Sequence, residues 1–169
     1  MDGGIAVQER IVDFFNSFGF SPWAVILFLG ALPVTELRAS IPVGILVLKQ
    51  SAKDVFLFSV LGNMLPIAPV YFLVNPVSKR LGNTRFMRSF FEWLFKRARA
   101  HADIVERYEA IGLMLFVAVP LPGTGAWTGA IIASILRMRF IPSFLAISSG
   151  VIIAAVIVTA FTLMGKLAF

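Results

Sequence analysis

The chain has 169 residues, of which 59% are hydrophobic and 14% charged, and its mean hydropathy is +0.89. Soluble domains have about 25% charged residues, so this composition predicts an integral membrane protein with a single membrane domain, residues 1–169, and no separate soluble domain. The net charge of +6 does not indicate a nucleic-acid partner, because the basic residues are concentrated in one segment where anionic lipid headgroups are the simpler partner.

The first predicted element is an amphipathic helix at residues 5–19. Apolar side chains recur there at helical spacing and charged side chains occupy the other face, in a segment too short and too charged to span a membrane. We expect this helix to lie in the membrane interface. The acidic start, without a basic region before an apolar core, does not fit a cleaved signal peptide.

Residues 22–48 form two apolar pieces around a polar interruption at 33–38. Each piece would be about 15–17 Å long as a helix, roughly half of a 30 Å hydrocarbon core. This pattern predicts a re-entrant helical hairpin whose tip is buried in protein or lines a wet cavity. Residues 54–78 follow as a predicted transmembrane helix, with a polar Gly62-Asn63 pair near its middle and prolines that predict a kink.

The segment 79–109 has eight Lys or Arg residues and four acidic residues, with apolar side chains at helical spacing. It predicts basic amphipathic helices on the cytoplasmic surface of the membrane. Residues 110–136 are uncharged but are interrupted by prolines and glycines at 120–125, which predicts a second re-entrant hairpin. Residues 140–165 predict a second transmembrane helix.

The two halves of the chain resemble each other at an offset of 87 residues. Ala31-Leu32-Pro33 corresponds to Ala118-Val119-Pro120, and Gly62-Asn63 to Ser149-Gly150. The predicted fold is therefore an all-α integral membrane protein with two inverted repeats, each a re-entrant helical hairpin plus one transmembrane helix, joined by basic amphipathic helices. Transporters with this architecture place a site at the membrane midplane between broken helices. The distribution of Lys and Arg leaves an alternative open, in which both hairpins are kinked full crossings.

Three motifs carry a resemblance to a known family. They are P-x-x-E-L-R-A-S-I-P-x-G at 33–44, L-G-N-x-L-P at 61–66 and P-L-P-G-T-G-A-W-T-G at 120–129. The pattern resembles the small multidrug export family of bacterial and archaeal membrane proteins. That family in turn looks related to the DedA-like, or VTT-domain, proteins, which are implicated in moving lipids, including polyprenyl phosphates, and are thought to have two re-entrant hairpins and proton coupling.

The resemblance implies a multi-pass protein of a prokaryotic inner (cytoplasmic) membrane and assigns roles to single residues. Glu36 resembles the glutamate of the DedA first hairpin, Asp54 the aspartate further along, and Arg137 the arginine after the second hairpin. Thr124 and Gly125 stand where the second hairpin of that group carries an arginine. The same handling of a phosphate headgroup is therefore not implied.

Four polar residues of the first half are candidate site residues. Glu36 either caps the helix that follows it or alternates between a protonated and a charged form that couples a proton to substrate movement. Arg38 either holds an anionic headgroup or neutralises Glu36. Asn63 either joins helices by a hydrogen bond or lines a cavity. For Asp54 we favour an interfacial N-cap of its helix over a binding role.

The second hairpin offers a possible anion site. Thr124 and the backbone N–H groups of Gly123 and Gly125 could form a small nest for an anion, or the glycines could simply turn the chain. Trp127 is either a lid over an amphipathic substrate or a packing residue. Arg137 lies at the exit of this hairpin.

The sequence lacks the motifs of an enzyme. There is no cysteine, no His/Asp/Glu cluster with metal-ligand spacing, no Ser-His-Asp set and no Walker-type loop, so we expect neither enzymatic activity nor a cofactor or metal. We expect a small transporter or lipid translocase that moves an anionic or amphipathic substrate, such as a lipid or polyprenyl phosphate, with protons as the coupling ion. Membrane lipids and a second copy of the chain, in a homodimer, are the expected partners. The alternative is a membrane scaffold that binds lipid or a partner through 79–109 without transport.

Overall fold

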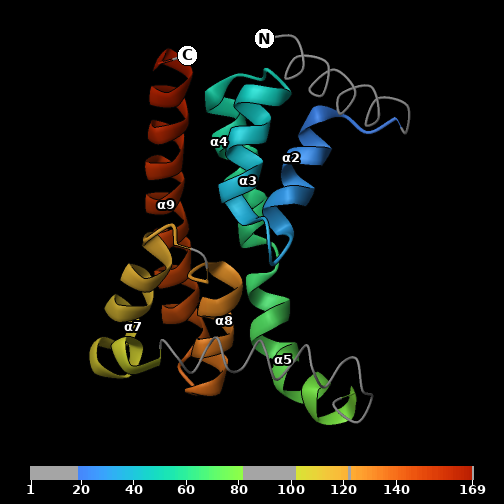
Figure 1. Cartoon of the computed structure of the whole chain (residues 1–169). Helices are drawn as coiled ribbons and strands as arrows, with labels where there is room; N and C mark the ends of the chain where they lie inside the picture. The colour runs from blue at the N-terminus through green and yellow to red at the C-terminus, as the bar shows by residue number, and fades with distance from the viewer. Residues whose placement is uncertain (1–18, 82–101, 122, 169) are drawn as a thin grey trace. The chain divides into compact units, whose positions relative to one another are not determined.

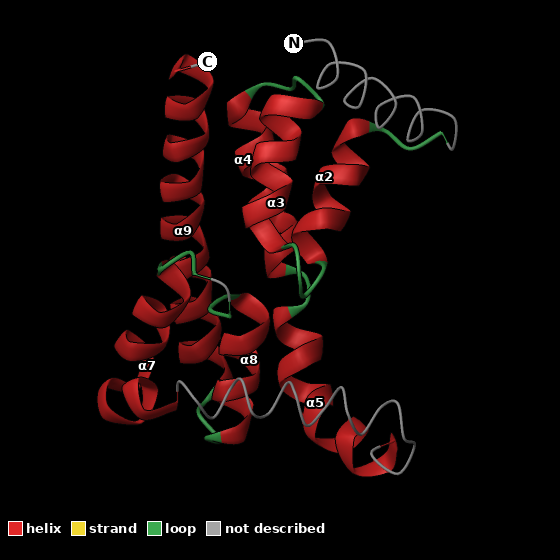
Figure 2. Cartoon of the chain, in the orientation of Figure 1, coloured by secondary structure: helices red, strands yellow, loops and turns green. Residues whose placement is uncertain are grey.

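The structure of the chain is a computed structural model that describes residues 19–81, 102–121 and 123–168. All regular secondary structure in these ranges is helical (Figure 2), which confirms the all-α class. The chain divides into two compact units, one made of Met1–Asn63 with Ala155–Phe169 and the other of Met64–Ala154. The predicted helix at 5–19, apart from its last residue, and the larger part of the predicted segment 79–109 lie outside the described residues.

The first unit contains a hairpin of two short helices, α2 (Pro22–Ala31) and α3 (Glu36–Pro42), which pack against each other (Figure 1). Ser21 begins α2, because its side-chain oxygen accepts a hydrogen bond from the Ala24 N–H at 3.3 Å. The 10 residues of α2 extend over about 15 Å, so this helix does not cross a hydrocarbon core by itself. The two helices occupy the range in which the sequence predicts two half-length pieces.

Pro42 ends the regular part of α3, and the chain continues as a π-helical turn, η1 (Val43–Val47). Because proline has no N–H, it interrupts the ladder of helical hydrogen bonds. The Leu48 N–H then donates to the Val43 carbonyl, five residues earlier, at 2.9 Å. Single π-helical turns are rare, and many of them lie at functional sites.

The next helices are α4 (Ala52–Met64) and α5 (Ile67–Leu81), separated by a turn at Leu65 and Pro66. The break lies at Pro66, as expected for a ring that does not fit the interior of a helix. The stretch Ala52–Val74 has 23 residues and is long and apolar enough to cross a membrane. The predicted crossing at 54–78 is therefore helical on both sides of a proline break and begins two residues earlier than predicted.

Glycines allow close packing of helices in the first unit. A Cβ atom added at Gly62 would lie 2.3 Å from the carbonyl oxygen of Leu27, so the backbones of α2 and α4 are in contact there. A Cβ atom added at Gly44 would lie 2.6 Å from Cγ1 of Val55, so η1 packs on the start of α4. Close approach through small residues is the usual way in which helices associate in lipid.

The second unit contains α7 (Ala102–Ala118) and α8 (Ala126–Ile135), together with α5. α5 and α8 pack along each other, and the Ser134 hydroxyl donates to the Tyr71 carbonyl at 2.8 Å. α7 is kinked at Glu109, which has φ 47° and ψ −125°. The kink separates a first part whose sequence contains charged residues from an apolar second part, Glu109–Ala118.

The last helix, α9 (Phe140–Ala168), is the longest in the described residues. Its stretch Phe140–Leu167 has 28 residues and is the second helix long and apolar enough to cross a membrane. A Cβ atom added at Gly150 would lie 2.6 Å from the carbonyl oxygen of Met114, so α9 packs on the apolar part of α7.

Similar local contacts occur in the two units, at sequence positions that are 87 or 88 residues apart. The apolar part of α7, Glu109–Ala118, lies 87 positions after Pro22–Ala31. In the first unit, Gly62 of α4 packs on the Leu27 carbonyl of α2. In the second unit, Gly150 of α9 packs on the Met114 carbonyl of α7. Glu36 and Gly123, 87 positions apart, both have positive φ angles, 48° and 106°.

Candidate functional site

Glu36 lies at the tip of the first hairpin, as the first residue of α3, and is 4% exposed. Its φ angle is 48°, in the left-handed region that residues other than glycine rarely adopt. The tip holds this conformation through the Glu36 N–H, which donates to the Leu32 carbonyl at 3.1 Å, and through the Thr35 hydroxyl, which donates to the Leu29 carbonyl at 2.6 Å. Such backbone strain costs about 1–3 kcal/mol and is found most often at active sites and switch regions.

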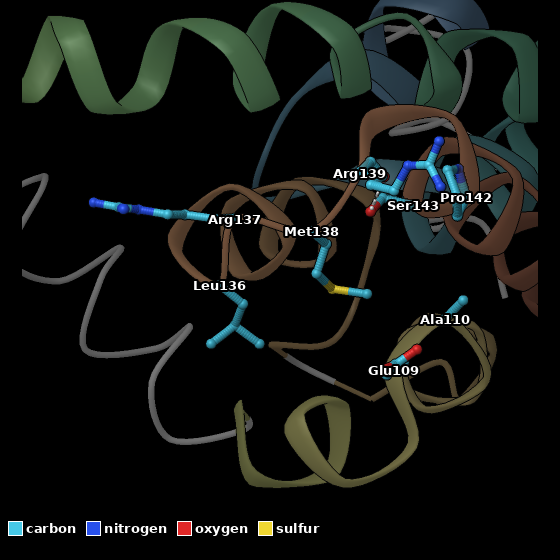
Figure 3. Close-up of a pocket in the computed structure, with 8 residues that line it drawn as sticks. All are labelled: Glu109, Ala110, Leu136, Arg137, Met138, Arg139, Pro142 and Ser143. Carbon is cyan, nitrogen blue, oxygen red and sulfur yellow. Dashed lines mark hydrogen bonds between the residues drawn. The ribbon is translucent and has the colours of Figure 1, made fainter.

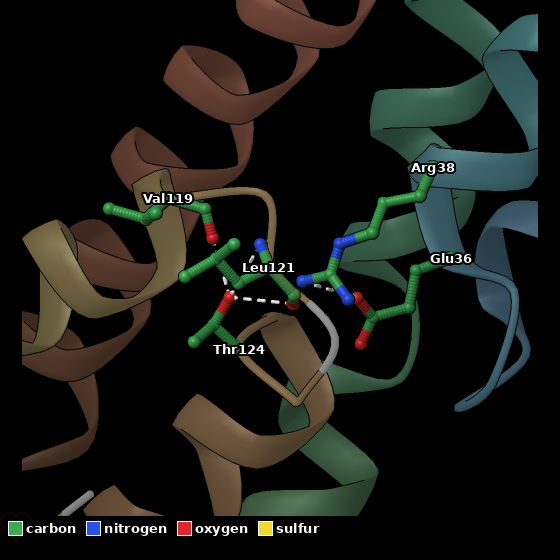
Figure 4. A network of polar contacts seen from close by, with 5 residues as sticks. All are labelled: Glu36, Arg38, Val119, Leu121 and Thr124. Carbon is green, nitrogen blue, oxygen red and sulfur yellow. Dashed lines mark hydrogen bonds and ion pairs between the residues drawn. The ribbon is translucent and has the colours of Figure 1, made fainter.

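Arg38 forms an ion pair with Glu36, with 3.6 Å between Nη2 and Oε2 (Figure 4). The pair joins the first residue of α3 to the third. The distance is longer than the 2.7–2.9 Å typical of a charge-assisted hydrogen bond. The side chain of Arg38 is 22% exposed and that of Glu36 6%, so the carboxylate is the more deeply buried partner.

Asn63 is buried in α4 at 1% exposure, and its Oδ1 atom has no hydrogen-bond partner in the described part of the chain. Two serines of the same unit, Ser40 on α3 and Ser59 on α4, are fully buried. Their hydroxyl oxygens also have no hydrogen-bond partner in the described part of the chain. Sequence reasoning did not place these serines in a site. Ser59 precedes Asn63 by four residues, and polar residues at i and i+4 in an uncharged segment are a signal that would have indicated a polar helix face.

Asp54 lies in the first turn of α4, two residues after its first residue. The helix begins after Ser51, whose carbonyl accepts a hydrogen bond from the Val55 N–H at 2.9 Å. The expected N-cap role of Asp54 is therefore wrong. Its carboxylate is still favourable in this turn, because the N-terminal end of a helix attracts negative charge.

In the second unit, Thr124 organises the turn between α7 and α8 (Figure 4). Its hydroxyl oxygen accepts a hydrogen bond from the Leu121 N–H at 3.2 Å, and it lies within donating distance of the carbonyls of Val119 and Leu121. The Thr124 N–H donates to the Leu121 carbonyl at 3.1 Å, and Gly123 adopts a φ of 106°. The hydroxyl of Thr124 is thus used inside the turn, which favours the turn-forming interpretation of this motif over an anion nest.

Replacing Thr124 by Val keeps the shape of the side chain and removes these hydrogen bonds. We expect a loss of about 0.5–1.5 kcal/mol of stability, because the carbonyls of Val119 and Leu121 lose the hydroxyl that lies within donating distance of both. Thermal unfolding of the purified chain checks this. Thr162→Val is the matched control, since Thr162 makes a single bond to the Val158 carbonyl of its own helix. An unfolding temperature lowered no more by Thr124→Val than by Thr162→Val would contradict the role of Thr124.

The remaining predicted site residues of the second unit lie apart in the fold. Gly125 precedes α8 with an extended backbone, φ 166°, and Trp127 is half-buried in the first turn of that helix. Arg137 is exposed after α8, with φ 53°. It lines a cavity of about 460 Å³, together with other residues that include Glu109, Arg139 and Ser143 (Figure 3). In the figure the side chain of Arg137 extends away from Glu109.

The structure therefore groups the candidate residues by unit. Glu36, Arg38 and Asn63 belong to the first unit with Asp54, and the candidates after residue 120 belong to the second. Within the described ranges, no group of three His, Cys, Asp or Glu side chains could hold a metal ion. What the first unit does contain is a buried carboxylate paired with an arginine at the tip of a hairpin of short apolar helices.

In the described residues the fold is all-helical, with two helices long and apolar enough to cross a membrane and a buried ion pair at a hairpin tip. Residues 36–157 match the family described as "Putative small multi-drug export protein". The chain belongs to this family of small multi-drug export proteins, and the resemblance seen in its motifs is thereby confirmed at the level of that family. The relation to DedA-like proteins stays a prediction. No curated protein and no solved structure matches the chain.

Proposed function

We propose that the chain is a small exporter or lipid translocase that moves an anionic or amphipathic substrate, with a lipid phosphate as the leading substrate class. The observation that carries this proposal is the buried Glu36–Arg38 ion pair, held by a strained backbone at the hairpin tip. An ionisable residue at membrane depth costs about 2.5–3.5 kcal/mol on insertion scales. A neutral residue would begin α3 at lower cost, which favours a functional role for the charge.

The two charges have complementary roles in this mechanism. Arg38 retains its positive charge and presents a planar group that suits phosphate oxygens. Glu36 competes with the substrate for Arg38 when it is ionised and releases Arg38 when it binds a proton. Proton binding to Glu36 and anion binding to Arg38 would then be coupled, because each of these events breaks the Glu36–Arg38 ion pair.

The matching contacts of the two units support an inverted repeat. In each unit a short apolar helix packs closely on a long one, through Gly62 with Leu27 and through Gly150 with Met114. A repeat of this kind fits transporters in which each half contributes a broken element to one central site. In the proposed topology both hairpins are re-entrant, the segment 79–109 is cytoplasmic, and the chain acts as a homodimer in a prokaryotic inner membrane.

Cysteine labelling tests the re-entrant topology directly, since the chain has no cysteine of its own. Single cysteines at Ser51, Arg139 and Lys166 would be exposed to a membrane-impermeant maleimide in intact cells. With re-entrant hairpins, Ser51→Cys and Lys166→Cys label from outside and Arg139→Cys labels only after lysis. If Ser51→Cys and Arg139→Cys label together and Lys166→Cys does not, the hairpins cross the membrane and the inverted repeat is lost.

The export proposal itself is tested in lipid vesicles that contain the purified chain. A fluorescent short-chain phosphatidic acid is placed in the vesicles, and dithionite destroys the fluorescence of lipid in the outer leaflet. A pH gradient across the vesicle should accelerate the movement of the probe between leaflets. Vesicles without the chain set the background, and an unchanged rate with the chain present would contradict a lipid-phosphate substrate.

A further inference from the structure

Besides the Thr159 hydroxyl on α9, the interior of the first unit holds three polar oxygen atoms that the proposed export mechanism does not use. They are the hydroxyls of Ser40 and Ser59 and the Oδ1 atom of Asn63, in residues that are 0%, 0% and 1% exposed. None of the three has a hydrogen-bond partner in the described part of the chain. Buried polar groups almost always have partners, so each exception calls for an explanation such as a bound water or ion.

Two other hydroxyls of buried residues show how such a group is satisfied within its own helix, whereas the buried hydroxyls of Ser148 and Thr159 also have no partner in the described part of the chain. Ser143 donates to the Arg139 carbonyl and Thr162 to the Val158 carbonyl, each four residues back in the same helix and each at 2.8 Å. Ser40 and Ser59 are also helical, but they do not make this bond. Their hydroxyl oxygens are therefore buried without the bond to their own helix that Ser143 and Thr162 make.

The register of the helices places these oxygens in adjacent layers. The segment formed by α3 and η1 is joined to α4 by residues 48–51, and Gly44 packs on Val55. Counted at about four residues per turn from this contact, in two segments that run in opposite directions, we infer that Ser40 and Ser59 lie at the same level. One further turn brings Glu36 level with Asn63.

Helix α2 closes this polar layer from a second side. A Cβ atom added at Gly30 would lie 2.9 Å from the Ser59 carbonyl oxygen and 3.4 Å from the Asn63 nitrogen. The backbone of α2 therefore contacts α4 at the level of both residues. The side-chain oxygens of this layer belong to two hydroxyls, an amide and the Glu36 carboxylate, which also pairs with Arg38.

We propose that Ser40, Ser59 and Asn63 bind a sodium ion in the interior of the first unit, with the Glu36 carboxylate as the nearby negative charge. Oxygen atoms are the preferred ligands of hard cations. A cation between α3 and α4 uses the three oxygens that otherwise lack partners, and the carboxylate at the end of the layer offsets the cost of its burial. The inference goes beyond export and does not depend on it.

The test compares sodium with other cations at equal ionic strength. The purified full-length chain is unfolded thermally in sodium chloride, potassium chloride and N-methyl-glucamine chloride. We expect sodium to raise the unfolding temperature in a saturable way, by about 5 °C at concentrations well above its dissociation constant. The double variant Ser40→Ala/Ser59→Ala should lose the sodium-dependent shift. The control variant Ser143→Ala should keep it, because that hydroxyl is satisfied within its own helix.

A second variant keeps the test decisive if the double variant does not fold. Asn63→Asp preserves the shape of the side chain and adds a negative charge to the proposed ligand set, so half-saturation should occur at a lower sodium concentration. The proposal is overturned if sodium and N-methyl-glucamine give the same unfolding temperature for the unmodified chain. It is also overturned if Ser40→Ala/Ser59→Ala keeps the shift, or if Asn63→Asp leaves half-saturation unchanged.

Discussion

Replacing Glu36 by Gln is expected to reduce transport of the phosphatidic acid probe by about 10-fold or more while the protein still folds and inserts. Glutamine has nearly the same shape and can occupy the same position at the start of α3, but it cannot exchange a proton or pair electrostatically with Arg38. A factor of ten corresponds to about 1.4 kcal/mol in the barrier, which is less than the cost of burying the charge. The measurement is the rate of lipid movement between leaflets in vesicles with and without a pH gradient.

Glu109→Gln is the matched control for Glu36→Gln. Glu109 is also a glutamate with positive φ, 47°, but it is exposed. We expect its replacement to leave the transport rate within about twofold of the unmodified chain, as for surface substitutions in general. If Glu36→Gln transports the probe at the unmodified rate, Glu36 is a structural residue. The scaffold interpretation, in which the basic segment 79–109 binds lipid or a partner, would then be the better one.

Replacing Gly62 by Ala is expected to destabilise the first unit and, with it, the position of the hairpin. The added Cβ atom would lie 2.3 Å from the Leu27 carbonyl oxygen and 3.0 Å from its carbonyl carbon. These are backbone atoms, so α2 and α4 must move apart to relieve the clash. Overpacking of this kind typically costs about 1–3 kcal/mol, and each kcal/mol lowers the unfolding temperature of a chain of this size by about 2–4 °C. Thermal unfolding of the purified chain measures the effect.

Gly165→Ala is the control for Gly62→Ala, because it replaces a helical glycine at a position where no clash arises. A Cβ atom added at Gly165 on α9 meets no atom within 4 Å. Alanine favours a helix interior over glycine by about 0.5–1 kcal/mol, so Gly165→Ala should keep or raise the unfolding temperature. An unfolding temperature for Gly62→Ala as high as that of Gly165→Ala would contradict the close contact of α2 and α4.

Several features of this fold could be predicted because they depend on local composition. Uncharged stretches of more than 20 residues indicate membrane helices whatever surrounds them, and the structure has helices at Ala52–Val74 and Phe140–Leu167. Proline removes a hydrogen-bond donor, so the sequence predicted a break near Pro66, Pro69 or Pro76, and the structure has it at Pro66, with the other two inside α5. The short helices on either side of residues 32–35 follow from the same reasoning.

Features that depend on packing were not predictable in this way. The sequence indicated Glu36 as a candidate but contained no signal for its left-handed backbone, which depends on the hydrogen bonds of the hairpin tip. The expected N-cap role of Asp54 was wrong, because an end of a helix can shift by two residues without any change in composition. The hydroxyl of Thr124 is engaged by the turn around it, which only the folded backbone shows.

The sequence by itself determined that this chain is a helical membrane protein with charged residues at one apolar hairpin, and its motifs determined the family. Apolar runs, prolines and rare intramembrane charges act locally, so their consequences can be derived from residue order. Only the tertiary structure decided that Glu36 pairs with Arg38 and that Ser40, Ser59 and Asn63 keep buried oxygens without partners in the described chain. The ion pair depends on the local backbone at the hairpin tip, and the buried oxygens depend on which helix faces touch, which is settled only when the chain has folded.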